Sequence, residues 1–140
     1  MKKSLIILLV VALFALAACK TAAPAPIFKV TSAGTQVAAF SSDDIKKLTA
    51  VEADYTGKDG AVTHYKGFAL TALLAKPGVT DSSVITLVAA DGYTAELSGK
   101  DLLACTSCMV VFMEKGGLQS VMPGFSSKLQ VKDLIEIQVK

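Results

Sequence analysis

Arginine is absent from this sequence of 140 residues, so its 14 basic residues are all lysine. They stand against 12 acidic residues, and the formal net charge of +2 vanishes once Lys2 and Lys3 are removed with the first 18 residues. Nucleic-acid binders rely on a basic surface and on guanidinium groups that make paired hydrogen bonds to a base or a phosphate. We therefore exclude nucleic acid as a partner.

Histidine and the common catalytic motifs are equally scarce. His64 is the one histidine, so a metal site with two histidines cannot form within one chain. The sequence has no Gly-x-Ser-x-Gly nucleophile elbow and no phosphate-binding or dinucleotide-binding glycine pattern. We therefore assign no catalytic residue and no metal ligand. These absences favour a protein that is not an enzyme.

The first 18 residues have the plan of a signal peptide. Lys2 and Lys3 precede an apolar run over residues 5–18. As a helix this run is about 21 Å long, at about 1.5 Å per residue, and is short of the roughly 30 Å hydrocarbon core of a bilayer. We therefore expect an export signal rather than a transmembrane span.

The end of this run, Leu16-Ala17-Ala18-Cys19, resembles the lipobox of bacterial lipoproteins. The resemblance implies cleavage before Cys19 and acyl chains, a diacylglyceryl group and usually a further chain such as palmitate, on that residue. Two or more acyl chains hold a protein stably on a bilayer. The expected location is the bacterial cell envelope, and Lys20 favours the outer membrane, facing the periplasm. An ordinary secretory signal followed by a cysteine is the alternative.

Residues 19–26, with the sequence CKTAAPAP, are small and contain two prolines. Such a segment cannot bury a core and is typical of a tether. We therefore expect one folded domain over residues 27–140, held to the membrane through a lipidated tether.

Hydrophobic alternation predicts mainly short strands in this domain, with three short helices. The first helix is expected to begin at Ser41, and the second carries Leu70 on its buried face. The third is expected to begin at Ser98, where Asp101 completes a capping pattern. The pattern is α+β with a mixed β-sheet rather than a regular alternation of strands and helices. The expected strands are residues 27–31, 36–40, 51–55, 61–65, 84–90, 93–97, 109–113, 118–122 and 134–139.

Three motifs in order are similar to the oxidoreductase molybdopterin-binding domain of the sulfite oxidase type. They are Phe40–Leu48, Tyr65–Leu74 and Ala90–Tyr93, which correspond to a capped helix, a helix start and an Asp-Gly hairpin in that family. Residues 121–124 and 131–137 resemble its C-terminal end, so the match covers about residues 27–140. This resemblance implies the sulfite oxidase fold, with molybdopterin as the cofactor. Together with the lipobox, it suggests a bacterial lipoprotein that contains such a domain.

The residues depart from this family where it binds its cofactor. The resemblance implies a cysteine thiolate for molybdenum after the first helix and arginines for the pterin phosphate, but residues 50–56 have no cysteine and the chain has no arginine. We therefore expect the fold without the cofactor, in a non-catalytic binding or accessory module. The alternative is a reduced molybdopterin-dependent oxidoreductase with its ligand from Cys105 or Cys108.

Cys105 and Cys108 form a Cys-x-x-Cys pair. In an exported protein the first interpretation is a structural disulfide. The alternatives are a thiol redox role and metal binding, including a Cu(I) carrier that uses neighbouring methionines. Haem attachment is excluded because Met109 stands where histidine is required. The methionines, Met109, Met113 and Met122, lie at strand spacing and are expected to fill the core instead.

A ligand cleft is the remaining prediction. If the domain binds a ligand where the similar family does, His64, Tyr65, Asp91 and Tyr93 lie near the loops that would form the site. The expected partners are the lipid bilayer, through Cys19, and an envelope protein or a small ligand that the sequence does not identify.

Overall fold

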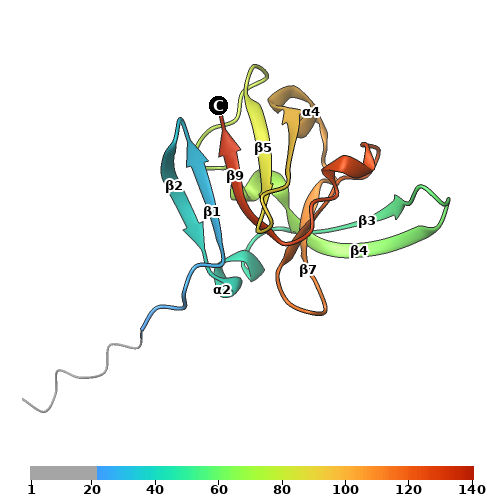
Figure 1. The fold of residues 1–140 in the computed structure, drawn as a ribbon, viewed down its shortest axis with the longest axis horizontal. Helices are drawn as coiled ribbons and strands as arrows, with labels where there is room; N and C mark the ends of the chain where they lie inside the picture. Colours follow the sequence, from blue (N-terminus) through green and yellow to red (C-terminus); the bar gives the residue numbers. More distant parts are fainter. Residues whose placement is uncertain (1–21) are drawn as a thin grey trace, which may run out of the picture.

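Two β-sheets and a few short helices make up the part of the chain that the structure, a computed structural model, describes, residues 22–140 (Figure 1). The predicted signal peptide, the predicted lipidation site Cys19 and the first residues of the predicted tether lie outside the described residues. The prediction of an α+β fold with a mixed sheet is confirmed. The division of the strands between two sheets could not be anticipated from their pattern.

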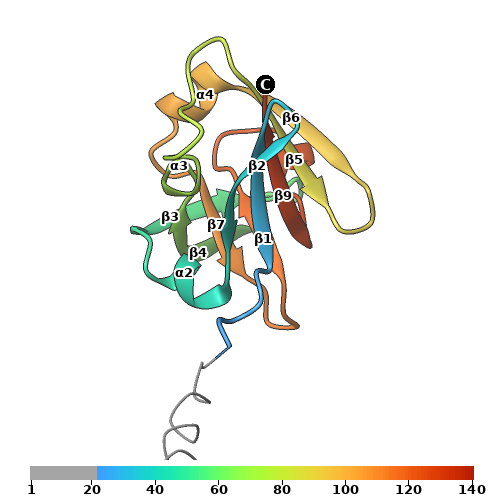
Figure 2. The same cartoon turned by 90° about the vertical axis from the view of Figure 1, so that its left-hand side faces the viewer.

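The larger sheet has five strands in the order β2-β1-β9-β5-β6. Strands β1 and β9 run parallel, and the other neighbours are antiparallel, which makes the sheet mixed. Figure 2 shows this sheet on one side of the domain, with helices α3 and α4 on the other. Its strands are β1 (Phe28–Ser32), β2 (Thr35–Phe40), β5 (Val84–Ala89), β6 (Thr94–Ser98) and β9 (Leu134–Val139).

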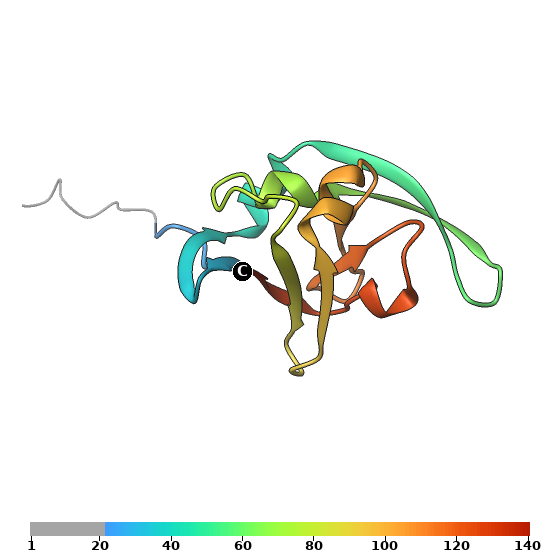
Figure 3. The ribbon, with the colours of Figure 1, turned by 90° about the horizontal axis from the view of Figure 1, so that it is seen from above.

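The smaller sheet is antiparallel, in the order β3-β4-β7-β8. The hairpin of β3 and β4 projects beyond the rest of the domain (Figures 1 and 3). The predicted strand over residues 61–65 is too short, because the strand continues through Tyr65 and Phe68 to Ala69. Its strands are β3 (Ala50–Thr56), β4 (Val62–Ala69), β7 (Met109–Phe112) and β8 (Leu118–Val121).

Short helices connect the strands, and their caps explain where they begin. Ser41 caps α2 (Ser42–Lys46) with a full capping box to Asp44, and Ser98 caps α4 (Gly99–Ala104). Helix α3 (Leu70–Leu73) is a single turn that ends before the limit set by Pro77, and a 3-10 turn, η1, covers Ser127–Leu129.

One main core joins the two sheets and the helices. It contains Phe28 and Leu87 from the larger sheet, Val110 from the smaller sheet, and Ile45 and Leu102 from the helices, all almost fully buried. A second, smaller cluster on the other face of the smaller sheet is formed by Met109, Val111 and Val121, with Tyr55 and Tyr65 packed against it.

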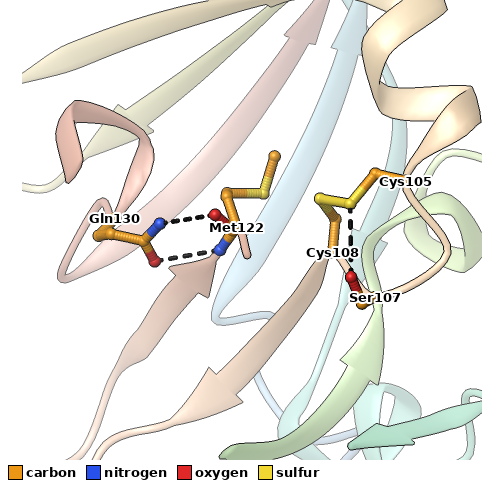
Figure 4. The surroundings of a disulfide bond; sticks show 5 residues. All are labelled: Cys105, Ser107, Cys108, Met122 and Gln130. Carbon is orange, nitrogen blue, oxygen red and sulfur yellow. Dashed lines mark hydrogen bonds between the residues drawn. A yellow bond between two sulfur atoms is a disulfide. The ribbon is translucent and has the colours of Figure 1, made fainter. Parts of the chain in front are cut away.

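A buried serine ties the smaller sheet to the chain that leads into β9. The Ser120 hydroxyl donates to the carbonyl of Leu129 at 2.6 Å and accepts from the backbone N–H of Val131 at 2.8 Å. The Ser120 N–H donates to the Val131 carbonyl at 2.9 Å. Next to it, the Gln130 amide pairs with both backbone groups of Met122, at 3.0 and 3.1 Å (Figure 4). These bonds attach the chain segment before β9 to strand β8 and the residue after it.

Truncation of this serine should be costly. Ser120→Ala leaves the Leu129 carbonyl and the Val131 N–H without partners in a site that is closed to solvent, so we expect a loss of about 2–4 kcal/mol in the free energy of unfolding. Urea denaturation measures it. Ser127→Ala, whose hydroxyl makes no hydrogen bond within residues 22–140, is the matched control, and equal stability of the two variants would contradict the assignment.

A polar cluster lies on the face of the larger sheet that points away from the core. The Glu136 side chain is only 12% exposed and lies 3.1 Å from the Lys29 ammonium. It also accepts hydrogen bonds from Thr31 at 2.8 Å and from Gln138 at 3.3 Å. Burial by itself raises the pKa of the Glu136 carboxyl, but these hydrogen bonds and the ammonium charge outweigh it and hold the pKa below its ordinary value.

The stability of the domain should therefore depend on pH through Glu136. Its pKa is lower in the folded chain than in the unfolded chain, so its contribution is present above the ordinary value of 4.5 and is lost as the pH falls through the folded value. We expect Glu136→Gln to flatten the fall in unfolding free energy between about pH 5 and about pH 3. Glu96→Gln controls for the change in net charge, and parallel curves for wild type and Glu136→Gln would refute the prediction.

Candidate functional site

A cleft of about 610 Å³ opens between strands β4 and β7. One wall is the β4 segment His64–Lys66, and the other is Val111–Met113 at the end of β7. The remaining lining residues come from the β7–β8 turn, from β8 and from the chain before β9. They are Glu114, Lys115, Gly116, Gln119, Lys132 and Asp133, and we call the whole site the β4–β7 cleft.

The cleft exists because the end of β4 pairs with the start of β7 and the two strands diverge away from this contact. Only Phe68 with Val110 and Ala69 with Met109 are paired between β4 and β7. Gly67 permits this close approach, since a Cβ there would overlap the Val110 carbonyl oxygen. Beyond that point, the Phe112 ring packs edge-on against Phe68 at 6.1 Å, so β7 follows the core while β4 continues into the projecting hairpin.

The divergence leaves one edge of β4 without a neighbouring strand. The bonds from Gly57 N–H to the Ala61 carbonyl and from Ala69 N–H to the Thr49 carbonyl show that odd-numbered residues of β4 pair with β3. Hydrogen bonding alternates between the two edges of a strand. The N–H and C=O groups of Val62, His64 and Lys66 therefore point to the open edge, where His64 and Lys66 line the cleft, and no strand of residues 22–140 pairs with this edge there.

Charged side chains cross the solvent face of this hairpin. His64 Nδ1 lies 2.7 Å from Asp54 Oδ1, and the Lys66 ammonium lies 2.9 Å from Glu52 Oε1. The hydrogen bond from Lys66 lowers the pKa of Glu52, and the same bond raises the pKa of Lys66. Because all four side chains are exposed, these pairs add little stability, but they balance the charge along the β4 wall.

The four residues predicted for a ligand cleft do not share one site. His64 and Tyr65 line the β4–β7 cleft, whereas Tyr93 lines a separate depression of about 430 Å³ beside η1 and donates its hydroxyl to the Lys128 carbonyl at 3.0 Å. Asp91 lines neither and accepts the Tyr93 N–H at 2.9 Å within the β5–β6 turn. The β7 wall and Lys132 were not predicted for this cleft, because only long-range packing brings them beside His64; Lys132 lies in the 131–137 motif, but that motif carries no signal for a ligand site.

The cysteine pair is a disulfide, and it lies apart from the cleft. Cys105 and Cys108 are bonded, with Cys108 buried and Cys105 half-buried beside a depression of about 290 Å³ (Figure 4). The bonded sulfurs offer no thiolate to a metal. Cys105 also follows the C-terminal end of α4, where the helix dipole disfavours an anion, whereas reactive thiolates gather at N-terminal ends.

Two of the three methionines named with this pair fill the core, and the prediction that they all do is wrong for Met113. Met109 and Met122 are fully buried, and Met122 lies close to the disulfide (Figure 4). Met113 is half-buried and lines the β4–β7 cleft. These positions agree with side chains that fill gaps rather than with a cluster of sulfur ligands.

The described residues do not fit molybdopterin. A molybdenum centre needs a thiolate, but both cysteines of residues 22–140 are in the disulfide. The cations of the β4–β7 cleft are lysines, which lack the planar fork that grips a phosphate on two oxygens. Within the same residues, no group of three or more histidine, cysteine, aspartate or glutamate side chains is placed to hold a metal ion.

Comparisons with known proteins add no family: no family model matches the chain, and no curated protein matches it. Among the described helices, none is both long and apolar enough to cross a membrane.

Proposed function

We propose that this chain is an exported lipoprotein of the bacterial cell envelope, anchored through acyl chains on Cys19. The order of charged start, apolar run, small residues and cysteine supports the anchor. The Cys105–Cys108 disulfide supports export, because such bonds persist in oxidising compartments. By resemblance to lipoprotein sorting, Lys20 favours the outer membrane and a domain that faces the periplasm.

The domain itself is, in this proposal, a non-catalytic binding or accessory module with a fold of the sulfite oxidase molybdopterin-binding type. The order of the three motifs supports the fold relationship. The observation that carries the function is the β4–β7 cleft, which offers unpaired backbone groups and an apolar wall but neither a thiolate nor an arginine. Such a surface suits recognition of a partner better than redox chemistry at a metal.

The anchor is tested by one substitution. Cys19→Ala should abolish incorporation of labelled palmitate into the protein, because the thiol that starts lipidation is gone. Metabolic labelling followed by immunoprecipitation through the C-terminal end measures it. Cys105→Ala is the matched control and should still be labelled; equal labelling of both variants, or no labelling of the wild type, would argue against lipidation at Cys19.

The absence of molybdenum chemistry is tested by metal analysis of the full chain. Protein expressed in a host that makes molybdopterin should contain molybdenum far below one atom per chain, because residues 22–140 offer no free thiolate and the sequence has no arginine to hold the cofactor. Stoichiometric molybdenum that disappears on Cys105→Ser or Cys108→Ser substitution would establish the oxidoreductase instead.

A further inference from the structure

We propose that the β4–β7 cleft binds an extended peptide, which adds as a strand to the open edge of β4. This inference deepens the proposed binding function and rests on it, because it assigns a class of ligand to the same cleft. The edge supplies the N–H and C=O groups of Val62, His64 and Lys66. A row of alternating donors and acceptors at strand spacing is complementary to another extended backbone.

The shape of the cleft favours one strand over a pair of strands. Its walls converge where Phe68 pairs with Val110, and at that end β4 and β7 are direct neighbours. The β7 wall, Val111–Met113, runs alongside the open edge. A single extended segment can enter such a wedge, whereas a hairpin from a second copy of the chain would bring two strands to its narrow end.

The side chains around the edge predict the pattern of the peptide. On one face, Tyr65 and Val111 belong to the small apolar cluster. On the other face, Lys66 and His64 are already matched by Glu52 and Asp54. Successive side chains of a strand point to opposite faces. The ligand should therefore alternate apolar residues with uncharged polar ones.

The direct test measures binding of a defined peptide to the full chain. A fluorescein-labelled peptide of alternating threonine and valine with a terminal lysine should bind saturably, as measured by fluorescence anisotropy. Backbone N-methylation at all threonines, or at all valines, removes the donors along one edge of the peptide. We expect at least one of these two peptides to lose binding, the threonine set for an antiparallel strand and the valine set for a parallel one. Equal binding of all three peptides, or no binding, overturns the proposal.

A pair of proline variants tests which edge of the hairpin is used. His64→Pro removes an N–H that faces the cleft, while Asp54→Pro removes one on the outer edge of β3. Both break the same 2.7 Å contact between His64 and Asp54, so they differ mainly in the edge affected. We expect His64→Pro to weaken binding about tenfold or more and Asp54→Pro to leave it near wild type. If the two proline variants weaken binding equally, the proposal is overturned. If either variant fails to fold, binding of the N-methylated peptides to the wild-type chain decides the question.

A crosslinking experiment separates this inference from the proposed function. With p-benzoylphenylalanine in place of Met113 in the cleft, or of exposed Leu103 on α4 as control, light should crosslink a partner polypeptide in native membranes only from Met113. A crosslinked partner that His64→Pro does not reduce leaves the binding module standing but overturns strand addition. A crosslink to a second copy of the chain also overturns strand addition. If nothing is crosslinked from Met113, both strand addition and the proposed binding function are overturned.

Discussion

The hydrogen bonds of one buried serine tie the smaller sheet to the chain that leads into β9 of the larger sheet. Ser120 satisfies its own N–H and hydroxyl and the backbone groups of Leu129 and Val131, so the chain that leads into β9 is bonded to β8. Backbone groups in such a closed place need partners, because an unpaired one costs as much as several exposed ion pairs contribute. The same stretch continues into Lys132 and Asp133, which form the far side of the β4–β7 cleft.

The cleft itself follows from unequal strand neighbours. Strand β4 is eight residues long and β7 only four, and aromatic packing between Phe68 and Phe112 directs β7 to the core. Open strand edges invite unwanted pairing, and charged side chains commonly protect them. His64 and Lys66 lie at this edge, so the hairpin combines an open row of backbone groups with side chains that oppose indiscriminate pairing.

The disulfide stabilises the start of β7 and is not part of the β4–β7 cleft. It joins the end of α4 to the residue before β7, and the Cys108 carbonyl accepts the N–H of Leu70 at the start of α3, at 3.0 Å. The start of β7 is therefore held on two sides while its end diverges from β4. The cleft is kept open because the start of β7 is fixed next to β4 while the end of β7 lies apart from it.

Local signals determined much of this protein. Alternation placed the strands, Asp91-Gly92 and Gly57–Gly60 placed turns, and Ser41 and Ser98 placed helix starts, because caps, turns and alternation involve residues within a few positions of one another. The spacing of Cys105 and Cys108 already permitted their disulfide.

The tertiary structure alone decided the rest. Which strands become neighbours depends on contacts between residues far apart in the sequence, such as the parallel pairing of β1 with β9, and periodicity carries no record of them. For the same reason the sequence placed Tyr93 with His64, while the fold separated them and brought Val111 and Lys132 to His64 instead. Local geometry determined the elements, and long-range packing determined which of their edges stayed open.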